Sequence, residues 1–571
     1  MDKYPGERRC RLRDPVFGVN YFGRSGVRDF FRSFDEAEVV EDLTMIADSG
    51  FNSIRVFVFW QDLMPTYGIL DMGIVSNTRR LLDLAGNHQI GVILSPFTVW
   101  MNGTVFLPSW LQNAVLAAPE ARVAQQETVA ALGSLMGSHS ALIGFDLGDE
   151  APYADLERNR QVPATDVRTW HHEISKAVND HFGPEVLVMQ PNPIQVFVDA
   201  PQFGPANQQT LAACGLHAFP TLTSLSIDSN GHRKAAQQIS FAVGVARALH
   251  SCVIVDELGA YGCADELAGR YLTDATEAAL RAGAIGVVYW CWKDVSTSGS
   301  PYGRRPNERS MGLCRADGSP KPQLDSVRKA IVKWRNRVVV GAGVEEPVVE
   351  VLLTEAFLNP ARSYLNSTHD ASTGLRALFS AHVLLETMSI GHRFVTVASG
   401  KSPMLLVPSV DELSETDLQA IASARQAGVR VVVSVGEPAD GFPGSELGVA
   451  LEDSVYRSMA HEQVRFADGT EVTLDWECRP KARVARLSAE SLEGCGLHVW
   501  ATFGDSTPAV IHRMRDKPDD DAELTVVLFP LEFLAERMGS PTDQEARLFE
   551  RIVRGLDFSS IHQRKGTRCA H

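Results

Sequence analysis

Eight short β-prone runs, most of them separated by stretches with helical periodicity, fill the first 340 residues of the chain. Alternating strands and helices are typical of a parallel sheet that is covered on both faces. Eight is also the number of strands that closes a (β/α)8 barrel. We therefore predict an α/β protein whose residues 1–340 form a (β/α)8 TIM barrel. The runs are 17–22, 53–60, 90–97, 141–147, 185–190, 214–219, 251–257 and 284–292.

The stretches between these runs carry signals for the start and end of helices. Ser33 and Glu36 have the spacing of a capping box, and Gly50 is suited to end the helix that follows. The weakest connection is NQQTLAA (207–213), which is at best a short helix. A doubly wound open sheet is the alternative, but no run is followed by GxGxxG or GxxxxGK[ST]. The barrel is favoured.

A second α/β unit is expected after a linker at VVVGAGVEEP (338–347). Apolar runs such as MLLVPSV and VRVVVSVG alternate with helical stretches, one of which begins at Ser414–Asp417. We predict a smaller open-sheet domain, flavodoxin- or amidotransferase-like, over residues 345–571. The mixed polar residues at about 450–520 read as an inserted β-rich region.

Charge and cysteine content limit the partners of the chain. The formal net charge of -16 would repel nucleic acid and anionic membranes, and no apolar run reaches about 18 residues. The first residues lack the apolar core of a signal peptide. The nine cysteines are scattered without a CxxC pair, which suits a reducing compartment. We expect a cytoplasmic protein with no nucleic-acid or membrane partner.

Acidic residues end two of the predicted barrel strands. The fourth run continues into Asp149 and Glu150, and the seventh ends at Glu257. Functional residues of this fold lie at the C-terminal ends of the strands, so the two glutamates are expected to face one mouth. Hydrolysis of a glycosidic bond needs such a pair of carboxyl groups. The other candidate substrate-binding residues are Arg55, Trp60, Asp149, His217, Trp290, Trp292 and Tyr302, although any one tryptophan could serve only in packing.

Several motifs, in order, resemble those of clan A glycoside hydrolases, especially the family-5 cellulase, mannanase and β-mannosidase group. The resemblance covers about 15–335. It implies that Glu150 is the general acid/base and Glu257 the nucleophile of a retaining β-glycosidase, with Arg55 bracing the nucleophile. The motifs are GVNYFG, GFNSIRVFVFW, IGFDLGDE, VIVDELG, VVYWCW and SPYGRRPNERSMGLCRADGSPKP.

Two positions depart from the pattern of that group. Asp149 stands where asparagine is usual, and its charge would help Glu150 to keep a proton. Phe219 stands where a tyrosine often hydrogen-bonds the nucleophile. Either Tyr302 or Tyr261 replaces that phenol, or the site is tuned differently.

The second domain resembles the amidotransferase-like domain of family-42 β-galactosidases. It looks catalytically empty, because SVGEP (434–438) follows its strand where an amidotransferase needs a cysteine. The resemblance implies a homo-oligomer, a trimer or dimer. It also implies exo-action on a small glycoside or short oligosaccharide, with a β-mannoside or β-galactoside as the expected substrate.

Three alternatives remain open. A metal-dependent hydrolase is disfavoured, because His171 and His172 are adjacent, His217 stands alone and no HxH or HExxH occurs. A non-catalytic carbohydrate-binding or scaffold protein on a decayed barrel would explain Asp149 and Phe219. A transglycosylase would use the same two glutamates. We expect neither a metal ion nor a cofactor.

Overall fold

The chain divides into two compact units. One comprises residues 1–223 and 229–343, and the other comprises 224–228 and 344–571. Residues 341–347 of the expected linker lie outside the described residues, and the helix α10 (Pro322–Val340) extends into its first part. The computed structural model describes residues 15–220, 225, 227–340, 348–358, 372–410, 413–436, 444–475, 481–488, 496–513, 523–535 and 537–555.

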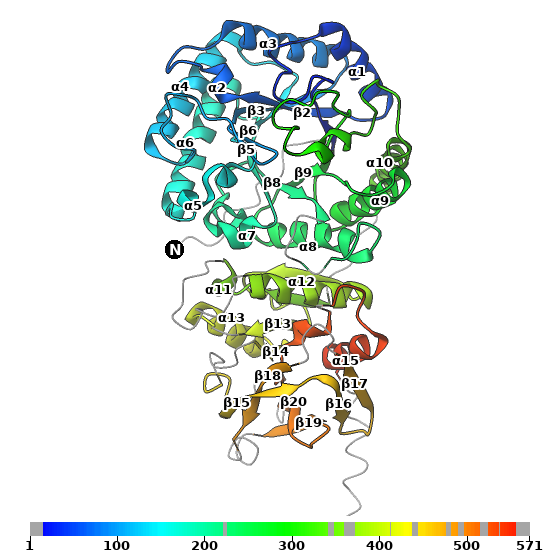
Figure 1. Ribbon diagram of the computed structural model, residues 1–571. Coiled ribbons are helices and arrows are strands. Elements are labelled where there is room, and N and C mark those ends of the chain that lie inside the picture. The colour runs from blue at the N-terminus through cyan, green and yellow to red at the C-terminus, as the bar shows by residue number, and fades with distance from the viewer. Residues whose placement is uncertain are drawn as a thin grey trace, which may run out of the picture. The chain divides into compact units, whose positions relative to one another are not determined.

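The first unit contains a closed barrel of eight strands (Figure 1). Each strand pairs in parallel with its neighbours, in the order β1-β10-β9-β8-β7-β6-β3-β2. The predicted (β/α)8 barrel is therefore confirmed. Its strands are β1 (Val16–Asn20), β2 (Ser53–Phe59), β3 (Gly91–Thr98), β6 (Leu142–Asp146), β7 (Leu187–Pro193), β8 (Ala213–Ala218), β9 (Val253–Leu258) and β10 (Gly286–Tyr289).

Helices surround these strands in Figure 1. The first of them begins after Asp35, whose carboxylate accepts hydrogen bonds from the backbone N–H groups of Ala37 and Glu38. The expected cap at Ser33 is corrected, because an aspartate directly before the first turn makes the capping bonds. With α10, the longer helices are α1 (Glu36–Asp48), α3 (Met72–Asn87), α4 (Pro119–Met136), α6 (Ala164–Phe182), α8 (Arg233–Leu249) and α9 (Asp265–Arg281).

The weak connection between the fifth and sixth strands contains only short turns. NQQTLAA forms no helix beyond its first residue, and two of the turns before it begin at prolines, which suit the first turn of a helix. These elements are α7 (Val196–Asp199), η2 (Pro201–Phe203) and η3 (Pro205–Asn207).

Polarity changes along the barrel strands. An apolar cluster draws on their beginnings, with Val16, Leu187 and Ala213 as the first residues of β1, β7 and β8. Charged side chains appear instead at strand ends, as with Asp146 at the last position of β6 and Glu257 next to last in β9. The C-terminal end of the barrel is therefore the polar end.

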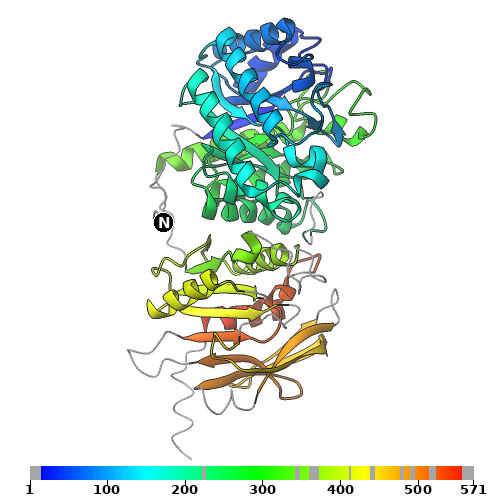
Figure 2. The same ribbon diagram turned by 90° about the vertical axis from the view of Figure 1, so that its left-hand side faces the viewer.

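The second unit is built on a nine-stranded mixed sheet. Its first five strands pair in parallel and its last four antiparallel. In Figure 2 the antiparallel strands (orange) lie farther from the helices α12 and α13 (green to yellow) than the parallel strands do. In sheet order the strands are β12 (His392–Val395), β11 (Val349–Leu352), β13 (Met404–Val410), β14 (Arg430–Val435), β21 (Leu524–Val527), β20 (Pro508–Arg513), β19 (Leu497–Phe503), β16 (Ala460–Phe466) and β17 (Glu471–Asp475).

Two helices cover opposite faces of the parallel strands. The crossover from β11 through α12 (Ser372–Thr387) runs toward one edge of the sheet, and that from β13 through α13 (Glu415–Gln426) runs the other way. Right-handed crossovers in opposite directions place their helices on opposite faces. The expected capping box is confirmed at Ser414 and Asp417. Among the described residues, no helix combines the length and apolar character needed to span a bilayer.

Candidate active site

A tight turn after β6 presents Glu150 at the polar end of the barrel. The backbone of Glu150 is left-handed, with φ of 40°, which is unusual for a residue with a side chain. Gly148 has φ of 132°, and a Cβ there would lie 2.8 Å from Leu116 Cδ1. Its backbone N–H donates to Asp146 Oδ1 at 2.8 Å. The glycine thus allows the chain to turn closely against the barrel wall and expose the glutamate.

Arg55 of β2 links carboxyl groups at the ends of two barrel strands, β6 and β9. Its side chain is fully buried. Nη1 donates to Glu257 Oε1 at 2.7 Å, whereas Nη2 donates to Asp146 Oδ2 and Asp149 Oδ1, each at 2.7 Å. Nη1 also donates to Asn20 Oδ1 at 3.1 Å. The guanidinium therefore fixes Glu257 and Asp149 in one charged network, as expected for a brace.

His217, near the end of β8, lies between the two predicted catalytic glutamates. Its Nδ1 is 2.9 Å from Glu150 Oε1 and 3.5 Å from Glu257 Oε2. These two oxygens can therefore lie no farther apart than the sum of the two distances. One imidazole nitrogen thus brings the two glutamates together at the end of the barrel.

The cluster contains more carboxyl groups than cationic side chains. Two cationic side chains, Arg55 and His217, face five carboxyl groups. Burial lowers the pKa of His217, but Glu257 and Asp256 outweigh it and raise that pKa well above its ordinary value. Burial raises the pKa of Asp149 to about 6, against the influence of Arg55 and His217. The five carboxyl groups belong to Asp146, Asp149, Glu150, Asp256 and Glu257.

The predicted nucleophile depends on these cations for its charge. Burial raises the pKa of Glu257 well above its ordinary value, and the positive charges of His217 and Arg55 act in the opposite direction. Among the described residues, neither Tyr302 nor Tyr261 makes a hydrogen bond to Glu257. Tyr302 accepts a hydrogen bond from the backbone of Val27 at 3.2 Å, and the side-chain hydrogen bond described for Glu257 comes from Arg55.

Trp100 holds the other glutamate. Its indole Nε1 donates to Glu150 Oε2 at 3.1 Å. The residue lies in β4 (Trp100–Met101), which forms a hairpin with β5 (Thr104–Val105). Asn102 and Gly103 make the turn with φ of 49° and 77°, as a two-residue hairpin turn of positive φ requires. This hairpin brings an indole N–H to the site.

A third glutamate, Glu308 in η5 (Pro306–Ser310), joins the site. Burial raises its pKa to about 7, a hydrogen bond with Trp290 lowers it, and the charge of Glu150 raises it again. Trp290 itself is 4% exposed and packs against Phe22 and Phe57. Trp290 therefore contacts the site by its hydrogen bond with Glu308. Most of the Trp290 ring is covered by other residues of the barrel.

Three predicted substrate-binding residues lie elsewhere. Trp60 is fully buried, donates to Thr128 Oγ1 and packs against Phe97 and Trp110. The expectation that Trp60 faces the substrate is corrected, because it begins a helix outside the barrel strand, α2 (Trp60–Leu63). The hydroxyl of Tyr302, as described above, is bound to a backbone group.

Trp292 is the third of these corrections. Its indole donates to Asp42 Oδ1 at 3.1 Å, on helix α1, and the side chain is fully buried. The sequence predicted that the eighth strand extends to position 292. In the structure β10 ends at Tyr289, so Trp292 lies beyond the strand.

The sequence did not assign Asn20, Asp146 or Glu308 to the site. It gave Trp100 only as an aromatic residue that could face a sugar ring, and Asp256 only as a residue at the end of the seventh strand. Asp146 ends the strand β6, so strand position could have identified it as well. Trp100 could have been found from the Asn-Gly pair two residues after it, which signals a hairpin. Glu308 stands in the quoted tail motif, but only the folded loop shows which residues it meets.

Asp149, His217 and Glu257 lie close enough together to contact one metal ion. Arg55, however, already places its guanidinium 2.7 Å from both Asp149 and Glu257. Like charges repel, so a cation would have to displace this arginine. The chemistry of the cluster favours proton transfer over metal binding.

Replacing Trp100 with phenylalanine is expected to reduce kcat/KM about 10-fold or more, because the hydrogen bond that holds the carboxyl group of Glu150 is lost. Steady-state kinetics on an aryl glycoside would measure it. Trp110→Phe is the matched control: its indole donates to the Met64 carbonyl at 2.7 Å and belongs to the same loop. Equal losses in both variants would mean that the bond to Glu150 has no special role.

The sequence matches no family model and no curated protein. Its fold does match solved structures. An exo-β-1,4-mannosidase from Opitutaceae bacterium strain TAV5 is 20% identical, with a TM-score of 0.76 over 98% of each chain. GH5_18 from Streptomyces cattleya, in complex with Manβ1-4GlcNAc, is 21% identical, with a TM-score of 0.57 over 67% of this chain and 94% of that one.

A polyextremophilic β-galactosidase from the Antarctic haloarchaeon Halorubrum lacusprofundi has the same two-unit fold. It is 13% identical, with a TM-score of 0.68 over 94% of this chain and 89% of that one. The fold of this chain is therefore shared with mannosidase and β-galactosidase structures, the two groups that the sequence motifs resemble. The predicted fold, a barrel followed by an α/β unit, is confirmed.

Proposed function

We propose that the chain is a retaining β-glycosidase with Glu150 as general acid/base and Glu257 as nucleophile. The observation that carries this is the meeting of both glutamates at His217 Nδ1, at 2.9 and 3.5 Å. They come from strands four and seven of the barrel. The likeness to known glycosidase structures supports the same reaction class.

In the first step, Glu257 attacks the anomeric carbon while Glu150 protonates the departing oxygen. In the second step, Glu150 takes a proton from water, which releases the sugar from Glu257. Glu257 must be ionised to attack, and Arg55 and protonated His217 favour that form. His217 Nδ1 is within hydrogen-bonding distance of Glu150 Oε1 and orients this carboxyl group.

We propose an exo-acting enzyme on short β-mannosides or β-galactosides. An open cavity of about 650 Å³ adjoins the hairpin that carries Trp100. Since Trp100 binds the acid/base residue, we assign this cavity to the leaving-group side of the substrate. It is lined by Gly103, Thr104, Val105, Ser300, Pro301, Gly303 and Arg304.

The function is tested with a panel of aryl β-glycosides that differ only in the sugar. We expect cleavage of the β-mannoside or the β-galactoside, with the β-anomer as the first product seen by NMR. An α-anomer would overturn the retaining mechanism. Release of oligosaccharides from a mid-chain position would overturn exo-action. An inactive panel, with sugar binding retained, would favour the non-catalytic alternative, and dominant transfer to added alcohol would favour a transglycosylase.

We also propose that the second unit mediates assembly into a homo-oligomer. Its support is the likeness of the whole chain to a two-unit β-galactosidase structure. Sedimentation velocity on the full chain measures the assembly directly, and a monomer at micromolar concentration would contradict the proposal.

Glu308→Gln is expected to shift the alkaline limb of the kcat/KM profile to lower pH. The pKa of Glu308 is raised to about 7, so this side chain becomes charged as the pH rises through neutrality. Its charge then helps nearby Glu150 to keep the proton that it must donate. At pH 6 the side chain of Glu308 is mostly neutral, and the amide of the glutamine variant resembles it. The activity of the variant at this pH should therefore stay within about threefold of the wild type.

Profiles measured from pH 5 to 9 test this prediction. Asp317→Asn is the control, since this exposed carboxylate lies in a turn further along the chain. If the limb stays in place in Glu308→Gln, the charge of Glu308 does not act on the acid/base residue.

A further inference from the structure

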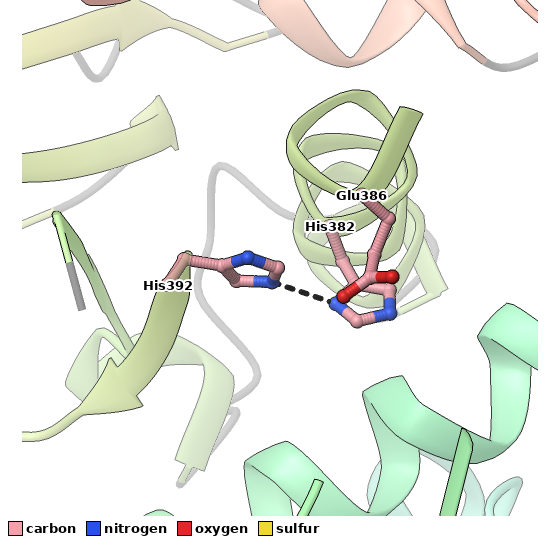
Figure 3. A group of neighbouring side chains, drawn as sticks. All are labelled: His382, Glu386 and His392. Carbon is pink, nitrogen blue, oxygen red and sulfur yellow. Dashed lines mark hydrogen bonds between the residues drawn. The ribbon is translucent and has the colours of Figure 1, made fainter. Parts of the chain in front are cut away.

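Three potential metal ligands meet in the second unit, away from any role in the proposed reaction. His382 and Glu386 lie on the same side of α12, and His392 at the start of β12 points toward them (Figure 3). Their donor atoms all lie within 4.8 Å of one another. We propose that these three residues form a binding site for a zinc-type divalent ion.

Local chain geometry brings the three side chains together. Residues four apart on a helix share a face, which aligns His382 and Glu386. After the helix ends at Thr387, the chain reverses through Ser389, which has φ of 54°, and enters β12 at His392. The three ligands thus lie on one short helix–turn–strand segment, whose strand β12 pairs with β11 at the edge of the sheet.

The protonation state of His392 suits a ligand. Its Nδ1 lies 3.1 Å from the carbonyl oxygen of Ile390, and a carbonyl only accepts, so Nδ1 carries the hydrogen. The lone pair is then on Nε2, directed at His382 Nδ1 at 2.8 Å. A backbone carbonyl that orients the ring is the usual second partner of a metal-bound histidine.

Metal binding would replace the hydrogen bond between the two rings. His382 would carry its hydrogen on Nε2 instead of Nδ1, which frees the Nδ1 lone pair. The two nitrogens would open to about 3.3 Å, as tetrahedral Zn–N bonds of about 2.0–2.1 Å require. Glu386 would supply a negatively charged oxygen from the exposed side, with water as the fourth ligand. Two imidazoles and a carboxylate favour zinc, cobalt, nickel or copper over magnesium or calcium.

The test is metal binding to the untagged full chain. Zinc content after equilibrium dialysis gives the stoichiometry, Co²⁺ absorption reports the coordination, and a chelating dye gives the Kd. His392→Gln is expected to abolish the site, and Glu386→Gln to weaken binding by at least about 10-fold. Because Glu386 is exposed, its variant tests the site without removing a buried side chain.

Two further variants locate the ion. His461→Gln changes an exposed histidine of the same unit and should bind zinc as the wild type does. His217→Gln removes the barrel histidine, and binding should again be unchanged. Zinc should also raise the melting temperature of the wild type but not of His392→Gln. The proposal is overturned if wild type binds no zinc below millimolar concentration, if Glu386→Gln binds as wild type does, or if only His217→Gln loses the ion.

Discussion

Glu257→Ala is expected to lower kcat/KM for an activated aryl β-glycoside by about 10⁴-fold or more, because it removes the group that forms the covalent intermediate. Azide should restore turnover of this variant. It enters from the face that Glu257 occupied, so the product should be the inverted α-glycosyl azide. The measurement is the initial rate with and without azide, followed by NMR of the product.

Glu150→Ala provides the contrasting result. A leaving group that needs no protonation should still depart, because Glu257 is intact, so the first step is retained for activated substrates. Azide should then attack the glycosyl-enzyme and give the retained β-glycosyl azide. The two variants together assign opposite roles to the two glutamates.

The opposite pattern of azide products would exchange the roles of Glu150 and Glu257. Nearly full activity of the Glu257→Ala variant would rule out a double displacement through Glu257. Circular dichroism of each variant checks that the fold is retained. Asp294→Asn is a useful control, because this carboxylate is bound to Lys321 at 2.7 Å and to the backbone of Gly312.

The barrel could be predicted from the sequence because its signal is local. Each strand is a short apolar run bounded by helix signals, and the order of such runs fixes the topology. The ends of the strands could be predicted for the same reason, and the structure brings Glu150, His217 and Glu257 together at one end of the barrel. Their mutual distances depend on the closure of the barrel and, for Glu150, on the tight turn after β6.

The tryptophans could not be placed by the same argument. The face of a side chain alternates only within a strand, and β10 ends before both Trp290 and Trp292. Trp60 follows β2 directly but already belongs to a helical turn. Loop residues such as Trp100 and Glu308 depend on how the 100–110 and 300–310 segments fold over the barrel. A single sequence shows their composition but not this folding.

Arg55→Met is expected to destabilise the first unit by about 3–5 kcal/mol, because it leaves buried carboxylates without their partner. Asp146 is the most affected, since it is fully buried and bonds Arg55 through both Nε and Nη2. The measurement is the midpoint of urea unfolding of the full chain, monitored by far-ultraviolet circular dichroism. The two-unit chain is expected to show more than one transition, of which only the barrel transition should move.

A double variant separates the unpaired charge from lost packing. Arg55→Met combined with Asp146→Asn should be more stable than Arg55→Met alone, because the amide carries no charge to leave unpaired. Arg28→Met is the matched control: Arg28 is also largely buried and pairs with Asp62, but Asp62 keeps a second partner in Arg32. Its cost should therefore be smaller. The arginine does not stabilise the acidic cluster if Arg55→Met unfolds at the wild-type midpoint, or if adding Asp146→Asn lowers the midpoint of Arg55→Met further. Its role would then be confined to the reaction.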